Sequence, residues 1–159
     1  MESCPYPVTD LLPHTGRMVL LDRVTGYTDT VIEAELWVRQ ANPFFEPGRG
    51  IAAHIAIEWM AQACGAFVGL DALRQSRPVR IGFLLGTRNF KAERPWFLEG
   101  EQLTVRAQLV FRDSETGVFD CTLSDTALTA RAQLTLHQPE DLTAVLISQG
   151  IDVTKLSLR

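Results

Sequence analysis

The segment from Ile51 to Leu73 is the feature that most restricts the fold of this chain. It is apolar for almost its whole length, and three polar interruptions, His54, Glu58 and Gln62, stand four residues apart. At about 3.6 residues per turn, this spacing predicts a helix that carries all three side chains on one face and is apolar elsewhere. We expect such a helix to be buried, either by a sheet that curves around it or by a second subunit.

The polar face of this helix has two structural explanations and one chemical one. A segment this apolar could span a membrane, but a central glutamate and a histidine would each be costly in hydrocarbon. A carboxylate that only satisfies neighbouring backbone groups is the second alternative. A buried carboxylate is costly unless it is paired or neutralised, so the imidazole one turn away favours acid–base chemistry by His54 and Glu58.

Composition restricts the class of protein. The 159 residues are 46% hydrophobic and 21% charged, which is typical of one globular domain, and the net charge of −4 argues against a nucleic-acid binder. Cys4, Cys64 and Cys121 fit neither a disulfide framework nor a zinc pattern, so we expect free thiols and no metal. No nucleotide-binding loop is visible, which predicts no cofactor. The start of the chain lacks the pattern of a secretory signal and predicts a cytoplasmic location.

Alternation of apolar and polar residues predicts strands on both sides of the helix. Arg17 to Thr25 and Val31 to Val38 are expected to pair as a hairpin, with Gly26 as a turn signal. A loop rich in proline and glycine over 41–50 leads into the helix, and Arg80 to Thr87 is typical of a buried strand. Three more strands are predicted around residues 103–111, 119–123 and 128–136, and a short helix after Pro139.

This order of two strands, one long helix and about four strands predicts an α+β fold, with a curved antiparallel sheet around one central helix. One helix that is apolar around most of its surface also indicates a dimer. We expect a single domain over 1–159, with its core at about 10–137 and a C-terminal helix and tail over 138–159.

Four local strings resemble a known family. They are LLPHTGRMVLLDRV (Leu11–Val24), NPFF (Asn42–Phe45), IEWMAQACG (Ile57–Gly65) and GFLLGTRNFK (Gly82–Lys91). In this order they resemble the hotdog-fold β-hydroxyacyl-carrier-protein dehydratases of fatty acid synthesis, and more closely the dehydratases of aryl polyene pigment clusters. The resemblance implies a hotdog fold and an enzyme that removes water from a 3-hydroxyacyl thioester, giving a 2-enoyl thioester on an acyl carrier protein.

The resemblance also implies roles for individual residues. Glu58 precedes Trp-Met-Ala-Gln where the family has its carboxylate, which makes it the general acid. The family's loop histidine is absent, and His54 is the nearest candidate for the base. The backbone N–H of Ala53 matches the family's oxyanion donor, and Gln62 is expected to support Glu58 or bond sheet backbone.

Several other residues have plainer expected roles. His14 aligns with a histidine that the family often carries, and we expect it to be structural. The small residues on one side of the helix are expected to allow close packing; they are Ala61, Gly65 and Gly69. The basic residues around the GFLLGT string are a solvated rim or a contact for the carrier protein or its pantetheine phosphate; they are Arg80, Arg88, Lys91 and Arg94.

Two alternative functions stay open at this stage. A hotdog acyl thioesterase would need only the helix carboxylate, to activate water or attack the thioester. A non-catalytic or half-catalytic subunit of a heteromeric dehydratase would explain the missing loop histidine. The expected partners are therefore an acyl carrier protein and either a second copy of the chain or a related hotdog subunit, without nucleic acid or membrane.

Overall fold

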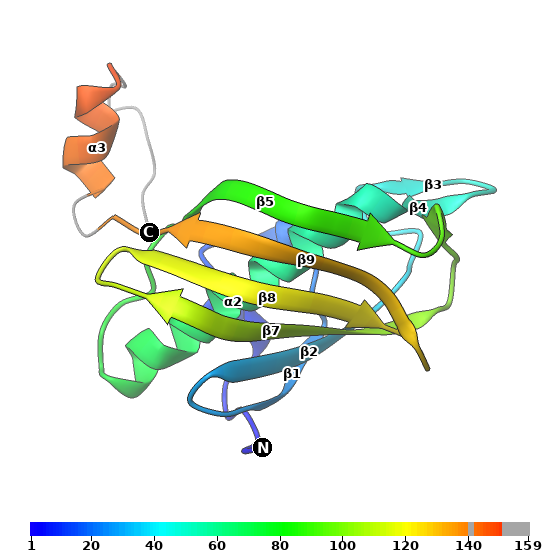
Figure 1. Ribbon diagram of the computed structural model, residues 1–159, viewed down its shortest axis with the longest axis horizontal. Coiled ribbons are helices and arrows are strands. Elements are labelled where there is room, and N and C mark those ends of the chain that lie inside the picture. The colour runs from blue at the N-terminus through cyan, green and yellow to red at the C-terminus, as the bar shows by residue number, and fades with distance from the viewer. Residues whose placement is uncertain (140–141, 151–159) are drawn as a thin grey trace.

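A six-stranded antiparallel sheet packed against one long helix forms the centre of the computed structural model, which describes residues 1–139 and 142–150 (Figure 1). The strands follow the order β1-β2-β7-β8-β9-β5 across the sheet. Their bounds are β1 Arg23–Tyr27, β2 Val31–Trp37, β5 Phe83–Ala92, β7 Gln102–Arg112, β8 Thr116–Ser124 and β9 Leu128–His137. The predicted α+β architecture is confirmed.

Short elements complete the fold. The helices are α1 Val8–Leu11, α2 Ala56–Arg74 and α3 Leu142–Ser148, and two 3-10 turns are η1 Gly16–Met18 and η2 Ala53–Ile55. A small second sheet contains β3 Phe45–Glu46, β4 Gly50–Ala52 and β6 Trp96–Phe97. The helix predicted after Pro139 corresponds to α3, and the tail beyond Gly150 lies outside the described residues. Judged by length and hydropathy, none of the described helices could span a lipid bilayer.

The central helix begins later than the sequence predicts. Ile51 belongs to β4 and pairs with Phe97 of β6, and His54 lies in the turn η2 before α2 starts at Ala56. The first residues of the apolar segment therefore form a strand that pairs with β6, and they do not belong to the helix. From there α2 buries most of its length, and Trp59 contacts Phe97 with ring centroids 5.3 Å apart.

The hairpin of β1 and β2 is confirmed, but its turn lies elsewhere. Gly26 is inside β1, next to a bulge that follows Val24. The turn is closed instead by the hydroxyl of Thr28, which accepts hydrogen bonds from the N–H groups of Thr30 and Val31 at 3.2 and 3.1 Å. The strand also starts only at Arg23, because the preceding residues form η1 and an extended segment against α2.

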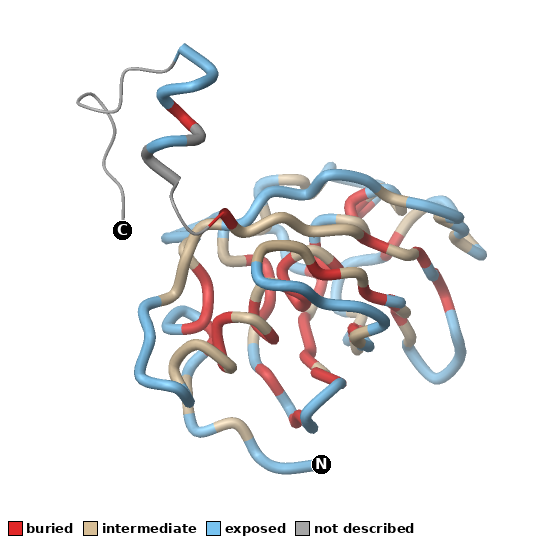
Figure 2. The backbone as a smooth tube through the Cα atoms, turned by 60° about the vertical axis from the view of Figure 1, so that its left-hand side comes forward, coloured by how far each residue is buried: buried red, intermediate tan, exposed pale blue. Residues whose placement is uncertain are grey.

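Strand β5 is an exposed edge and not the buried strand that its sequence predicts. It pairs with β9 on one side only, and Phe83, Leu84 and Leu85 keep 38%, 40% and 62% of their surfaces exposed. In Figure 2 the buried positions gather in the interior of the fold, and much of the outer chain is exposed. An apolar edge strand with free backbone groups is a surface on which another strand can pair.

Candidate active site

A cavity of about 180 Å³ runs beside α2 on the side of its polar face. The helix contributes Glu58, Ala61, Gln62, Gly65 and Val68 to the lining. The opposite walls come from the segment after α1, from the beginning of β5, from the β7–β8 turn and from the ends of β8 and β9; their residues are Leu12, Pro13, His14, Arg80, Gly82, Leu84, Arg112, Asp113, Ser114, Glu115, Thr116, Gly117, Phe119, Leu136 and Gln138. The cavity thus combines apolar wall with many polar and charged side chains, which make up half of the lining residues.

Glu58 and His14 both line this cavity, and the acidic residues Asp113 and Glu115 of the β7–β8 turn line it as well. Part of the His14 side chain is exposed, yet the protein atoms packed around the ring lower its pKa below 6.5, and the nearby Glu58 carboxylate opposes that shift. His14 is therefore mostly neutral at pH 7, the form in which an imidazole can accept a proton. Sequence reasoning treated His14 as structural, and the geometry places it beside the proposed acid.

Close packing holds the segment that carries His14 against the helix. A Cβ atom on Gly69 would lie 2.0 Å from the carbonyl oxygen of Leu11, so the two backbones touch where only glycine fits. Gly69 therefore packs as the sequence predicts. Gly65, one turn earlier, faces the cavity, and a Cβ there would meet the Leu12 side chain at 3.4 Å. Ala61 lines the cavity too, so these two small residues also leave room for a ligand.

Gln62 is buried and joins α2 to the same N-terminal region. Its Nε2 donates to the carbonyl of Met18 at 2.6 Å, and its Oε1 accepts from the N–H of Leu20 at 2.9 Å. The carboxamide thus satisfies two backbone groups of an extended segment that has no strand partner there. The partner is this segment and not the sheet backbone that the sequence analysis considered.

The structure does not bring His54 to the cavity. His54 lies in η2, is exposed, and is not among the residues that line the cavity with Glu58. Its assignment as base stays a prediction. The expectation that Glu58 is buried is wrong for the single chain, because Glu58 is exposed in the first turn of α2.

The expectation of an unpaired N–H at Ala53 is also wrong. This N–H donates to the carbonyl of Pro95 at 2.9 Å, which extends the pairing of β4 with β6. A donor that is already engaged in the protein cannot stabilise an oxyanion at the same time. Within the described ranges, no group of three or more His, Cys, Asp and Glu side chains gathers that could hold a metal ion.

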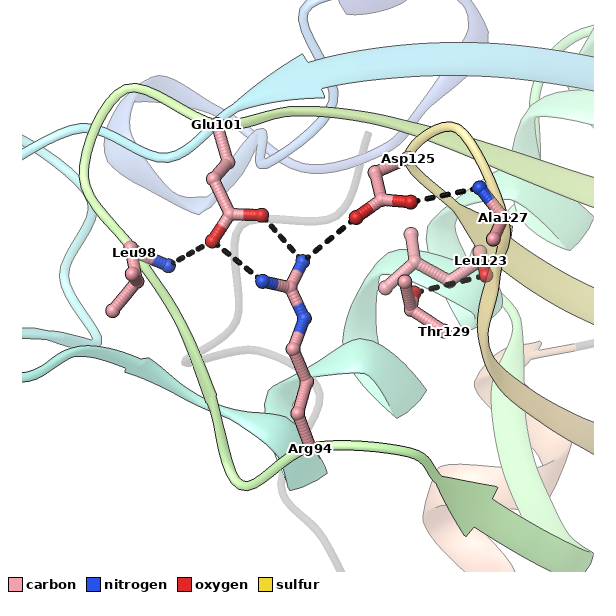
Figure 3. Close-up of polar contacts among 7 residues, drawn as sticks. All are labelled: Arg94, Leu98, Glu101, Leu123, Asp125, Ala127 and Thr129. Carbon is pink, nitrogen blue, oxygen red and sulfur yellow. Dashed lines mark hydrogen bonds and ion pairs between the residues drawn. The ribbon is translucent and has the colours of Figure 1, made fainter.

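Arg94, one of the predicted rim cations, is committed to structure (Figure 3). Its guanidinium makes a two-pronged contact with Glu101, 2.8 Å for the Nη1–Oε1 pair, and reaches Asp125 at 3.4 Å. Glu101 also accepts from the N–H of Leu98 at 2.6 Å. Arg94 therefore ties the segment before β6 to β7 and to the β8–β9 turn. Lys91 lies 3.9 Å from Glu93, and Arg88 is exposed on β5.

His14 is the candidate site residue that sequence reasoning missed. Helical spacing relates residues within one helix, whereas His14 reaches Glu58 from a segment more than forty residues earlier in the chain. The available signal was its position inside the string LLPHTGRMVLLDRV, which carried the family resemblance.

Comparison with solved structures identifies the fold. A chain of the dehydratase heterocomplex ApeI:P from Xenorhabdus doucetiae is 28% identical, with a TM-score of 0.84, and the match covers 90% of this chain and 97% of that one. The PaaI protein of Escherichia coli, from its phenylacetic acid degradation operon, is 14% identical with a TM-score of 0.56 over 72% and 81% of the chains. A hypothetical thioesterase from Streptococcus pneumoniae, solved with coenzyme A, is 13% identical with a TM-score of 0.56 over 74% and 84%. The last two show the fold alone, and it is the hotdog fold.

Comparison with family descriptions identifies the family, although no curated protein matches the chain. The ApeP-like family, described as ApeP dehydratase, matches residues 6–147. This range includes the whole cavity lining, the helix α2 and all six strands of the main sheet. The resemblance drawn from four short strings is confirmed, and the chain belongs to the ApeP-like dehydratase family.

Proposed function

We propose that this chain acts in the dehydration of 3-hydroxyacyl thioesters carried on an acyl carrier protein, giving 2-enoyl thioesters in fatty acid or aryl polyene-type biosynthesis. The observation that carries the proposal is the joint position of Glu58 and His14 on one cavity. The cavity continues along Gly65, Val68 and Phe119, where an acyl chain can lie. Membership of a dehydratase family supports the reaction type.

The reaction needs two proton transfers at neighbouring carbons. An imidazole removes a proton from C2, the C3–O bond breaks, and the protonated carboxyl of Glu58 supplies the proton with which the hydroxyl leaves as water. The proton then passes from the imidazolium to the Glu58 carboxylate. This transfer restores the neutral imidazole and the protonated carboxyl. Glu58 and His14 are both exposed in the single chain, so exclusion of water from the pair depends on a second subunit that covers this side.

Two histidines compete for the role of base. His14 shares the cavity with Glu58 in one chain and is favoured by its lowered pKa. His54 fits only a site that a second subunit completes, because it lies outside the cavity lining in the single chain. We assign the base to His14. His14→Gln should lower kcat about 10²-fold or more, and His54→Gln should leave it nearly unchanged; the opposite pattern would return the role to His54.

We further propose that β5 pairs with β5 of a second hotdog subunit. Its backbone edge is free in the described chain, and Phe83, Leu84 and Leu85 would be covered. The ApeI:P structure is a heterocomplex, which supports a related but different subunit as partner, with a second copy of this chain as the alternative. The exposed cations Arg88 and Lys91 on the same strand are the proposed contact for an acidic carrier protein.

Intact-mass spectrometry tests the reaction. A 3-hydroxyacyl carrier protein is incubated with the purified chain, alone and with a candidate second hotdog subunit. Loss of the mass of one water supports dehydration, and its appearance only with the second subunit identifies the chain as part of a heteromeric enzyme. Loss of the entire acyl group with release of free acid would identify a thioesterase, and no change under either condition would overturn the proposal.

A further inference from the structure

A second cavity, of about 210 Å³, adjoins the first near the C-terminal end of α2. The two cavities share the lining residues Val68, Arg80, Arg112 and Gln138. The second is completed by Ala72, Arg77 and Pro78, so three arginines and no acidic residue line it. The β7–β8 turn and the C-terminal end of α2 lie at this same end of the molecule (Figure 1).

The positive charge of these arginines is only partly balanced. Asp71, on α2, accepts a hydrogen bond from Arg112 at 2.9 Å and lies 3.8 Å from Arg77. In the described part of the chain, no side chain forms an ion pair or hydrogen bond with the Arg80 guanidinium, and the Arg80 carbonyl is held by Gln138 at 2.8 Å. Arg77 and Arg112 therefore share one carboxylate, and Arg80 has none among the described residues. The three arginines that line the second cavity thus carry more positive charge than Asp71 balances.

The acidic residues nearby belong to the first cavity and to its turn. Asp113 and Glu115 line the first cavity and are absent from the lining of the second. The Asp113 carboxylate accepts hydrogen bonds from the N–H groups of Glu115 and Thr116, at 2.9 and 2.8 Å, and these bonds lower its pKa. The Asp113 carboxylate is thus bound by backbone N–H groups of the β7–β8 turn.

The second cavity lies at a defined distance from the proposed acid. With a rise of about 1.5 Å per residue, the helix advances about 15 Å from Glu58 to Val68 and about 21 Å to Ala72. Gly65, Phe119 and Leu136 form apolar wall between these ends. An elongated substrate that reacts at Glu58 and follows this wall would therefore end beside the arginines. The distance from Glu58 to this end is comparable to the length of an extended phosphopantetheine arm.

We propose that Arg77, Arg80 and Arg112 form a subsite for an oxyanion carried by the same molecule that reacts at Glu58. Guanidinium groups bind phosphate and carboxylate through paired, charge-assisted hydrogen bonds. The subsite rests on the proposed function for the identity of the molecule. The oxyanion comes either from the phosphate of the pantetheine arm or from a carboxylate at the far end of the acyl chain.

Calorimetric titration with three unreactive amide analogues of an acyl pantetheine tests the subsite. One analogue is neutral, the second carries the 4′-phosphate, and the third carries a terminal carboxylate on the acyl chain. Each is titrated into the wild-type chain, Arg80→Gln and the control Arg131→Gln, an exposed arginine of β9 that lines neither cavity. Melting temperatures of both variants verify that they are folded.

One charged analogue should bind at least about fivefold more tightly than the neutral one, and this advantage should vanish in Arg80→Gln and persist in Arg131→Gln. An advantage of the phosphate identifies the pantetheine arm, and an advantage of the carboxylate identifies the acyl end. The proposal is overturned if neither charge improves the Kd, if both variants lose the advantage equally, or if none of the analogues binds. Because these are binding measurements, they stay distinct from a failure of the dehydration assay.

Discussion

The side-chain oxygen of Gln62 accepts a hydrogen bond from the backbone N–H of Leu20 over 2.9 Å, joining the middle of α2 to the chain that leads into β1. The same carboxamide donates to Met18. These bonds hold the N-terminal segment along the helix, and His14 lies on that segment beside Glu58. The arrangement of the proposed catalytic pair thus depends on a buried amide that takes no part in the reaction.

Removal of this amide should destabilise the protein. In Gln62→Leu the buried N–H of Leu20 and the carbonyl of Met18, whose hydrogen bond is partly buried, lose their partners, so we expect the free energy of unfolding to fall by about 1–3 kcal/mol. Urea denaturation measures the difference, and Gln108→Leu is the matched control, because this exposed glutamine of β7 makes no side-chain hydrogen bond within the described residues. Equal stability of the two variants would show that the Gln62 bonds contribute nothing.

Two glycines of α2 should differ sharply in their tolerance of a methyl group. Gly69→Ala places a Cβ against the Leu11 carbonyl, so the N-terminal segment must move away, and we expect a loss of more than about 2 kcal/mol. Gly65→Ala meets Leu12 only at 3.4 Å, so the stability should change little. Thermal unfolding of both variants measures this, and similar melting temperatures would contradict the packing described for Gly69.

Stability should depend on pH through His14. Its pKa is lowered in the folded chain, so below about 6.5 the unfolded chain binds a proton more readily than the folded one. The free energy of unfolding should therefore be level above that pH and fall as the pH drops through this range. Chemical denaturation at a series of pH values measures the slope of the free energy of unfolding against pH. In His14→Gln this part of the slope should disappear. An unchanged slope in the variant would contradict its assignment to His14.

The buried thiols should react slowly. Burial and the nearby Cys121 sulfur, 3.5 Å away, raise the pKa of Cys64 well above its usual range, so little thiolate forms. Cys4 is only partly buried. Mass spectrometry after brief alkylation of the native protein should find Cys4 modified first, with Cys64 and Cys121 labelled only after unfolding. Early labelling of Cys64 would indicate an opening between α2 and β8.

The sequence contains much of this fold in local patterns. Period-two alternation predicted β7, β8 and β9, and the apolar segment predicted α2, because both patterns arise from which side chains face the core. The exposure of β5 could not be read in this way. Its apolar run resembles a central strand, and only the topology shows that β9 is its single neighbour.

The candidate site was predictable only in part. Glu58 and Gln62 were placed on one helical face, and both line the cavity. The contribution of His14 depends on a close approach of distant segments at Leu11 and Gly69, which no helical period encodes. The Ala53 N–H looked unpaired as part of a helix start, and only the tertiary contact with Pro95 shows it engaged.

The rate of 2-enoyl formation by Glu58→Gln is the measurement that tests the central claim most directly. It is compared with the wild type and with Glu46→Gln, a carboxylate on the exposed strand β3, in the presence of the second subunit if the chain requires one. Glu58→Gln keeps the size of the side chain and removes its acidic proton. We expect a loss of about 10²- to 10⁴-fold in kcat with an unchanged melting temperature, while Glu46→Gln stays active. A Glu58→Gln protein that dehydrates its substrate at the wild-type rate would contradict the proposed role of this carboxylate.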